Sequence, residues 1–176
     1  MRIHFLLILT LSALPFLRFS FFENAKQEFV CTPCGNDCDK YVYNKSGSCR
    51  HCNMALVDKA TVKFSNYTPQ QTCKKLNDPN VIVLDVRTVE EFKGATYPNF
   101  GRFKNAINIP IQELEQRMQE LNAFKHKEII VYCSHSQRSP RAAYMLGQKG
   151  FQKVGNMLGG ASTWNNIGDC NKWIVK

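Results

Sequence analysis

One cysteine stands where a predicted strand ends and a predicted helix begins. The apolar run of residues 129–132 is typical of a buried strand and is followed by Cys133. After a short polar loop, Ser139 suits the N-cap of a helix and Pro140 its first position. Such a loop directs backbone N–H groups and the positive end of a helix at the sulfur, which stabilises a thiolate or another anion. The sequence therefore predicts that Cys133 is the reactive residue.

A second group of cysteines has the spacing of a metal site. Cys31 and Cys34 form one C-x-x-C pair, Cys49 and Cys52 form another, and fourteen residues separate the pairs. Each pair supplies two thiolates from one turn, so two turns complete a tetrahedron around zinc. So short a segment buries little core and needs a cross-link, for which two disulfides are the alternative to zinc. Cys38 could replace a ligand, pair with another cysteine or stay free.

Length, composition and charge limit the classes of function. The 176 residues allow one domain and a small extra module, and 44% apolar with 21% charged residues is typical of a folded protein. The net charge of +9 comes without a dense basic run, which disfavours nucleic-acid binding. A basic surface attracts small anionic substrates. No organic cofactor is expected, and no oligomeric state is predicted.

Residues 1–25 are predicted to lie outside the fold as a signal peptide. Arg2 and His4 precede an apolar run over residues 5–17, which is shorter than the roughly 20 residues that span a membrane. We therefore expect export, to the periplasm of a bacterium. Because no small-x-small cleavage site is visible, an uncleaved signal that anchors the chain in the membrane is the alternative.

The remaining chain reads as two modules. Residues 28–59 are predicted to form a Cys-rich, zinc-ribbon-like module, and residues 60–176 an α/β domain with a central parallel sheet, because strands alternate with helices. Thr68 and Gln71 have capping-box spacing before a helix. Strands are predicted through Val62 and Phe64 and at 81–86, 106–109, 129–132 and 154–158; helices are predicted from Pro69, over 111–121, over 140–148 and over 161–167. Ligands of such sheets bind beyond the carboxyl ends of the strands, where Cys133 lies.

Several landmarks of the second module resemble the rhodanese-like family over about residues 60–170. The matching stretches are Leu84-Asp85-Val86-Arg87 with Glu91-Phe92, Ala106 to Pro110, Val131-Tyr132-Cys133, and Gly150-Phe151 with Val154, Leu158-Gly159-Gly160 and Trp164. Two features depart from the family pattern. The segment 93–105 is longer and carries Gly101-Arg102-Phe103, and Ser136 stands where many active loops have glycine.

The resemblance implies a rhodanese-type sulfurtransferase, similar to thiosulfate sulfurtransferases, with Cys133 and Arg138 as catalytic residues. Cys133 would take sulfane sulfur from thiosulfate or a related small anionic donor as a persulfide, and a thiol or cyanide would accept it. The loop that binds the substrate would comprise Ser134, His135, Ser136, Gln137 and Ser139. Asp85 would support the loop with Arg87 beside it, although a fold-stabilising ion pair is the alternative role for both.

Two other functions compete with sulfur transfer. Cysteine phosphatases and the related arsenate reductases use Cys-x5-Arg, whereas only four residues separate Cys133 from Arg138, and the tighter loop suits sulfur better than a phosphoester. A non-catalytic module that senses persulfide or metal is the second alternative. Cys73 and Cys170 are expected to lie near each other in this fold, either as a disulfide or as two unpaired thiols.

The Cys-rich module has a resemblance of its own. The segment from Gly47 to Val57 is similar to the second half of small heavy-metal-binding modules found beside bacterial efflux and redox domains. Asn53 stands at a glycine position of that pattern, and the usual first half is replaced by Cys31-Thr32-Pro33-Cys34. This departure favours a structural zinc site over a site that transfers metal.

Overall fold

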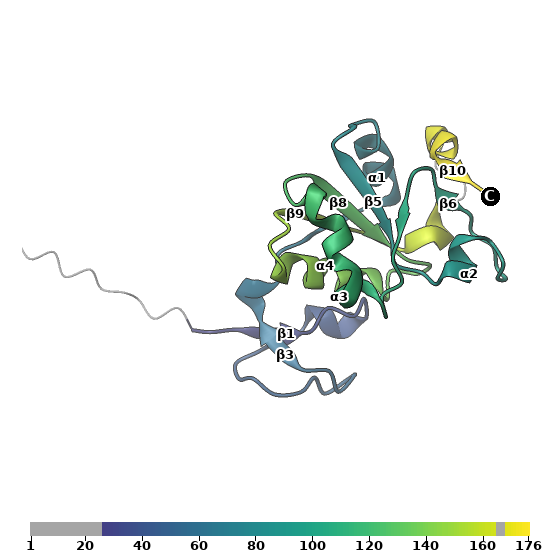
Figure 1. Cartoon of the computed structure of the whole chain (residues 1–176). Helices are drawn as coiled ribbons and strands as arrows, with labels where there is room; N and C mark the ends of the chain where they lie inside the picture. The colour runs from purple at the N-terminus through teal and green to yellow at the C-terminus, as the bar shows by residue number, and fades with distance from the viewer. Residues whose placement is uncertain (1–25, 165–167) are drawn as a thin grey trace, which may run out of the picture.

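The computed structural model describes residues 26–164 and 168–176. The predicted signal peptide or membrane anchor lies outside the described residues. Among the helices of the described part, none is both long and apolar enough to cross a membrane. Figure 1 shows a small N-terminal sheet next to a larger α/β domain.

The Cys-rich module is built on a three-stranded antiparallel sheet. Strand β1 (Phe29–Cys31) lies in the centre and pairs with β2 (Val42–Tyr43) on one side and β3 (Leu56–Asp58) on the other. A 3-10 turn, η1 (Asp37–Lys40), follows the first C-x-x-C pair. The side chains inside this module are mainly cysteines, of which Cys31, Cys34, Cys38 and Cys49 are buried. Its interior is therefore a group of sulfur atoms instead of an aliphatic core.

The α/β domain contains the parallel sheet that the alternation of strands and helices predicts. Its five strands are arranged in the order β4-β9-β8-β5-β7, and every neighbouring pair is parallel. The strands are β4 (Ser65–Tyr67), β5 (Val81–Asp85), β7 (Ile107–Asn108), β8 (Glu128–Tyr132) and β9 (Lys153–Met157). The helices are α1 (Pro69–Lys75), α2 (Val89–Phe92), α3 (Leu114–Arg117) and α4 (Ser139–Gln148), with 3-10 turns η2 (Lys59–Thr61), η3 (Met118–Phe124), η4 (Gly160–Thr163) and η5 (Gly168–Trp173). A separate ribbon pairs β6 (Arg102–Phe103) with β10 (Ile174–Val175).

The two faces of the sheet carry different cores. One face packs against α3, η3 and α4 through aliphatic side chains such as Leu84, Ile129, Leu121 and Leu146. The other face packs against an aromatic group, in which Phe103, Tyr132 and Trp164 meet edge to face or at a tilt. Central strand β8 supplies alternate residues to both faces, which is why its apolar run is continuous.

Several predicted boundaries are confirmed and others shift. Thr68 and Gln71 form the expected capping box at the start of α1. Helix α4 begins at Ser139 with Arg138 as its N-cap, so the prediction of Ser139 as N-cap is wrong by one position. The strand predicted through Val62 and Phe64 begins only at Ser65. The helix predicted over 161–167 is a 3-10 turn that ends at Thr163, and residues 165–167 lie outside the described part.

A disulfide joins Cys73 in α1 to Cys170 in η5, with 5.6 Å between the Cα atoms. It ties the start of the domain to its end across 97 residues. Of the two alternatives for these cysteines, the structure shows the bonded one. Because a cross-link over so long a loop restricts the unfolded chain, it stabilises the fold.

We expect Cys73→Ser to lower the free energy of unfolding by about 2–5 kcal/mol, measured by urea denaturation under non-reducing conditions. The double variant Cys73→Ser/Cys170→Ser is the matched control and should have the same stability as the single variant. A urea midpoint equal to that of the wild type would show that the bond does not form in solution.

Candidate active site

Cys133 lies directly after β8, the central strand, at the carboxyl end of the sheet. Residues 133–138, here called the catalytic loop, connect this strand to α4. The Cys133 side chain is 1% exposed. A sulfur in this position faces the first turn of a ten-residue helix and the N–H groups of the loop.

The surroundings of Cys133 favour the thiolate despite burial. Burial raises the pKa of the thiol, but hydrogen bonds from the Ser139 hydroxyl and from the N–H groups of Arg138, Ser139 and His135 outweigh it. The Cys133 pKa is therefore below its ordinary value. The Ser139 Oγ atom lies 3.5 Å from the Cys133 Sγ atom. Ser139 thus acts on the sulfur through its hydroxyl and does not cap the helix with it.

Arg138 is held by a carboxylate. Its two terminal nitrogens donate to the two carboxylate oxygens of Glu91 at 2.7 and 2.8 Å. The Ser134 hydroxyl donates to the same carboxylate at 2.6 Å. Hydrogen bonds from Arg138, from Ser134 and from the N–H of Thr88 hold the pKa of Glu91 at about 2, although its partial burial acts the other way. Both ends of the catalytic loop are therefore attached to Glu91 of α2.

The other loop residues differ in exposure and role. His135 and Gln137 are exposed, and the His135 ring meets the edge of Phe100 at 5.4 Å between centroids. Ser136 is buried, adopts φ of 59°, and its hydroxyl lies 3.2–3.3 Å from the side-chain amide of Asn156. The side chain of Ser136 thus faces the protein interior and that of His135 the surface.

The turn that begins with Gly159-Gly160, here called the glycine turn, packs against the backbone of the catalytic loop. The N–H of Ala161 donates to the Cys133 carbonyl at 2.7 Å, and the N–H of Ser162 donates to the Ser134 carbonyl at 2.9 Å. Gly160 has φ of 60°, and a Cβ atom there would collide with the carbonyls of Cys133 and Ser134. The Gly159-Gly160 pair of the sequence therefore permits this close approach.

Asp85 and Arg87 bond to each other. The Arg87 guanidinium donates to the Asp85 carboxylate at 2.7 Å and to the Gly101 carbonyl at 2.9 Å, and both side chains are fully buried. In the part of the chain that the structure describes, no hydrogen bond joins Asp85 to the catalytic loop. The pair fixes the segment before β6, which fits the fold-stabilising alternative and differs from the predicted loop support.

The Cys-rich module gathers five cysteines, and the group differs from the predicted ligand set by one member. The sulfur atoms of Cys31, Cys38, Cys49 and Cys52 lie within 4.8 Å of one another. A second set of donors shares Cys31 and Cys38 and adds Cys34 with Asp39. All five sulfurs are free thiols. Cys38 is buried in η1, while Asp39 accepts hydrogen bonds from the N–H and thiol of Cys34, so the donor set with Cys49 and Cys52 contains Cys38 instead of Cys34.

The donor set fits a metal ion. Zn–S bonds of 2.3 Å place the sulfurs of a tetrahedral site about 3.8 Å apart. The Sγ atom of Cys38 lies 3.9 Å from that of Cys31 and 3.7 Å from that of Cys52, and Cys31 and Cys52 are 3.2 Å apart. Burial raises the pKa of Cys31, and it raises that of Cys38 to about 12. Thiolates of Cys31 and Cys38 therefore need a cation for stability, which a bound metal would supply. In contrast, hydrogen bonds from the N–H groups of His51 and Cys52 lower the pKa of Cys49 to about 6.

Glu91 is the functional residue for which sequence reasoning gave no role. The sequence does contain a pattern that involves Glu91, because Thr88 and Glu91 have the spacing of the capping box that they form at the start of α2. The same reasoning also gave no role to Asn156, which lies in β9, 20 residues beyond Ser136. Neither contact is visible from local spacing, because each joins segments far apart in the chain.

The ion pair of Glu91 predicts a pH dependence. A carboxyl whose pKa is 4.5 in the unfolded chain and about 2 in the folded protein adds stability above pH 4.5 that is lost as the pH falls towards 2. We expect the free energy of unfolding of the wild type to exceed that of Glu91→Gln by roughly 1–3 kcal/mol near pH 7. This difference should shrink as the pH falls from 4.5 towards 2. Urea denaturation between pH 7 and 2 measures it, with Glu115→Gln, an exposed residue of α3, as the control. A difference that is constant across the window would contradict the assigned ion pair.

Comparison with solved structures finds the same architecture. A rhodanese-related protein of Thermoplasma volcanium superposes with a TM-score of 0.50 at 30% identity, covering 60% of this chain and 94% of that one. A rhodanese-like domain protein of Staphylococcus aureus gives 0.50 at 26% identity, over 60% and 95% of the two chains.

Curated proteins match over about half of this chain. The Bacillus subtilis protein YrkF, provisionally named a sulfur carrier protein, is 35% identical over 50% of this chain and 43% of its own length. The tRNA uridine(34) hydroxylase of Cronobacter sakazakii is 30% identical over 48% of this chain and 24% of its own. The match thus spans less than half the length of either relative.

The family match covers the α/β domain. Residues 68–167 match the rhodanese-like domain family, a span that contains the sheet from β5 to β9, the catalytic loop and the glycine turn beneath it. The chain therefore belongs to the rhodanese-like domain family.

Proposed function

We propose that this protein is a sulfurtransferase that carries sulfane sulfur on Cys133. The Cys133 thiolate attacks the outer sulfur of a small donor such as thiosulfate, an S–S bond forms, and sulfite leaves with the electron pair of the broken bond. A thiolate or cyanide then attacks the outer sulfur of the persulfide. The new bond to the acceptor forms as the S–S bond breaks, and the Cys133 thiolate is regenerated.

The observation that carries this proposal is the set of donors around Cys133. The N–H groups of His135 and Arg138 in the loop, with the N–H and hydroxyl of Ser139 at the start of α4, favour a negative sulfur at a position that is otherwise buried. The same donors would stabilise the thiolate that leaves when the acceptor takes the outer sulfur. The geometry thus serves both halves of the reaction.

The ion pair of Arg138 favours sulfur transfer over phosphate chemistry. A phosphatase of this type needs a guanidinium free to bind two oxygens of the phosphoryl group. Here both terminal nitrogens of Arg138 donate to Glu91. With only four residues between Cys133 and Arg138, this favours a sulfur donor over a phosphoester or arsenate. The net charge of +9 supports a small anionic donor as the partner.

The Cys-rich module is proposed to hold structural zinc. Cys31, Cys38, Cys49 and Cys52 would be its ligands, in the spacing described above. A closed tetrahedral set of four thiolates leaves no open position, so the ion would stabilise the module and take no part in the chemistry.

The place of action is proposed to be an oxidising compartment. Disulfides persist in exported proteins and are rare in the cytosol. The Cys73–Cys170 bond supports the expectation of export to the periplasm, with or without an N-terminal membrane anchor.

Mass spectrometry after incubation with thiosulfate tests the sulfur transfer. The wild type should gain one sulfur on the peptide that contains Cys133, and Cys133→Ser should gain none there and lose transfer to cyanide. The double variant Cys73→Ser/Cys170→Ser lacks two other cysteines and should still gain the sulfur. Full transfer activity in Cys133→Ser would overturn the assignment.

Metal analysis tests the zinc site proposed for the Cys-rich module. We expect about one zinc ion per chain in native protein. Cys38→Ser should weaken zinc binding strongly, whereas Cys34→Ser, which removes a neighbour of the site, should weaken it by at most about 10- to 100-fold. A larger loss of zinc binding in Cys34→Ser than in Cys38→Ser would support Cys34 as the ligand, as the C-x-x-C spacing predicts. Metal-free protein with Cys31 and Cys52 oxidised would favour disulfides.

A further inference from the structure

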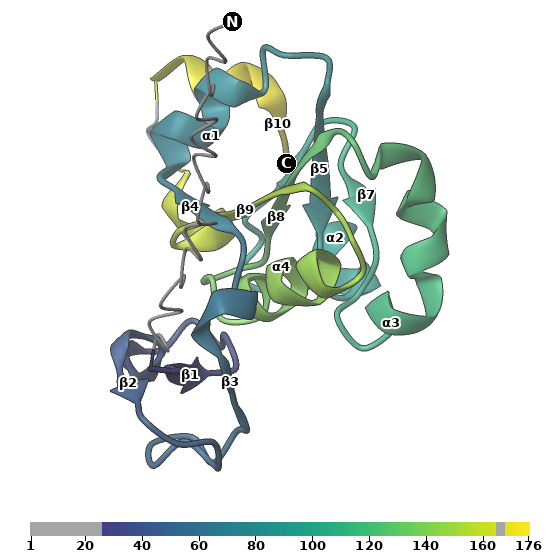
Figure 2. The ribbon, with the colours of Figure 1, turned by 90° about the vertical axis from the view of Figure 1, so that its left-hand side faces the viewer.

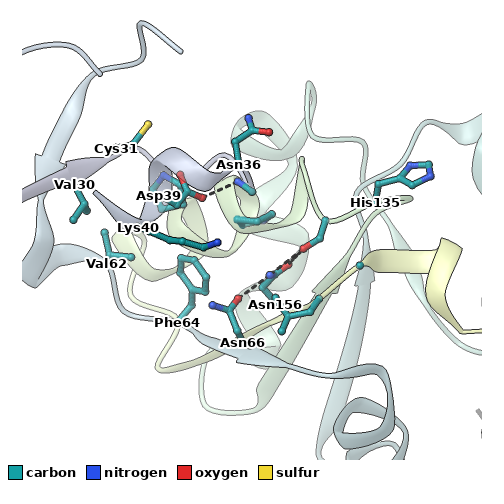
Figure 3. A pocket seen from close by; sticks show the side chains of 16 residues that line it. Val30, Cys31, Asn36, Asp39, Lys40, Val62, Phe64, Asn66, His135 and Asn156 are labelled. Carbon is teal, nitrogen blue, oxygen red and sulfur yellow. Dashed lines mark hydrogen bonds between the residues drawn. The ribbon is translucent and has the colours of Figure 1, made fainter. Parts of the chain in front are cut away.

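A glycine of the Cys-rich module lies against the catalytic loop. Gly35 follows the first C-x-x-C pair and lies so close to Ser136 that a Cβ atom on it would overlap the Ser136 carbonyl oxygen. The same atom would lie 2.9 Å from the Cα atom of Gln137. Around this contact is a cavity of about 480 Å³ lined by both modules, with Asn36 and Asp39 on one side and His135 and Asn156 on the other (Figure 3). Figures 1 and 2 agree in placing the module beside α4, at one end of the α/β domain.

The contact is made to Ser136, which has an unfavourable backbone conformation. Ser136 adopts φ of 59°, a left-handed conformation that costs a residue with a Cβ atom roughly 1–2 kcal/mol. Its hydroxyl is bound by Asn156, and the Gly35 backbone lies against its carbonyl. His135 directly precedes Ser136 and Arg138 follows it after Gln137, and the N–H groups of His135 and Arg138 favour the Cys133 thiolate. The conformation of Ser136 therefore controls the direction of those donors.

The segment that carries Gly35 is fixed at both ends by cysteines of the metal-binding group. Cys31 and Cys38 enclose it, and both belong to each of the two overlapping donor sets. Two N–H groups between these cysteines, those of Cys34 and Gly35, donate to the carboxylate of Asp39 at 3.0 and 2.7 Å. Whichever set holds the ion, a metal would fix the two ends of this segment, and Asp39 fixes its middle.

We propose that metal binding in the Cys-rich module positions the catalytic loop, with Gly35 as the positioning residue that acts on Cys133 through Ser136. Loss of the metal releases residues 32–37, removes the support of the Ser136 carbonyl, and lets the loop N–H groups turn away from the sulfur. The inference rests on the proposed function only in taking Cys133 as the reactive cysteine.

The test is the pH dependence of alkylation at Cys133, followed on its own peptide by mass spectrometry so that other cysteines do not contribute. In Gly35→Ala the rate near pH 6.5 should fall about tenfold, which is what a pKa of Cys133 one pH unit higher produces. The charged and titratable neighbours, Arg138, Glu91 and His135, are unchanged in this variant.

Gly47→Ala is the matched control. Gly47 lies in the same module and also has positive φ, but a Cβ atom on it would have nothing within 4 Å. It should match the wild type at Cys133 to within about twofold, which separates backbone strain in the module from contact with the loop. Metal analysis of both variants shows whether the module still holds its ion.

Removal of the metal from the wild type by a chelator should slow alkylation of Cys133 to the same extent as Gly35→Ala. In chelated Gly35→Ala no further loss should follow, because the two changes act through one contact. Ser136→Gly, which adopts positive φ without a Cβ penalty, should make the Cys133 rate insensitive to the chelator.

Three results would overturn the proposal: Gly35→Ala titrates like the wild type, Gly47→Ala slows alkylation as much as Gly35→Ala, or the effects of chelation and Gly35→Ala add. The readout needs no sulfur transfer. Slower alkylation in a protein that never gains sulfur would refute the proposed function alone, and sulfur transfer with unchanged alkylation would refute the positioning alone.

Discussion

A negative sulfur in a buried position is the constraint on which the rest of this site depends. Removing a thiolate from water is unfavourable, and burial alone raises the pKa of Cys133. Only donors that already point at the sulfur offset this cost without rearrangement. The loop N–H groups and the Ser139 hydroxyl are those donors, so the chain must fix the direction of each peptide group between Cys133 and α4.

The catalytic loop cannot fix these directions alone, and elements from across the chain hold it. Glu91 in α2 accepts hydrogen bonds from Ser134 near the start of the loop and from Arg138 at its end. The glycine turn after β9 supports the Cys133 carbonyl, where only glycine fits at position 160. Gly35 of the Cys-rich module lies against the Ser136 carbonyl. Both modules therefore contact the catalytic loop.

Local patterns in the sequence were sufficient to predict the parallel sheet and the position of Cys133. The continuous apolar runs that became β5 and β8, the capping box at Thr68 and the alternation of strands and helices predict the parallel sheet, since each depends on near neighbours. Cys133 was found in the same way, because a strand followed by a helix start defines its position. The one-residue error at the start of α4 arose because the Ser139 hydroxyl bonds to the sulfur instead of capping the helix.

Contacts between distant segments could not be predicted. The pairing of Arg138 with Glu91 joins residues 47 apart, and the place of Gly35 depends on how two modules pack. The grouping of Cys38, instead of Cys34, with Cys49 and Cys52 has a similar origin. Spacing alone favours C-x-x-C pairs, but the turn η1 and the hydrogen bonds of Asp39 decide which sulfur faces the centre of the group.

The most direct test of the account is the pKa of Cys133 in the unmodified wild-type protein, measured from the pH dependence of its alkylation. We predict a midpoint below that of an ordinary cysteine thiol, because the donors around the sulfur outweigh burial. A midpoint at or above that of an ordinary cysteine thiol would show that burial dominates and that the loop does not stabilise a negative sulfur.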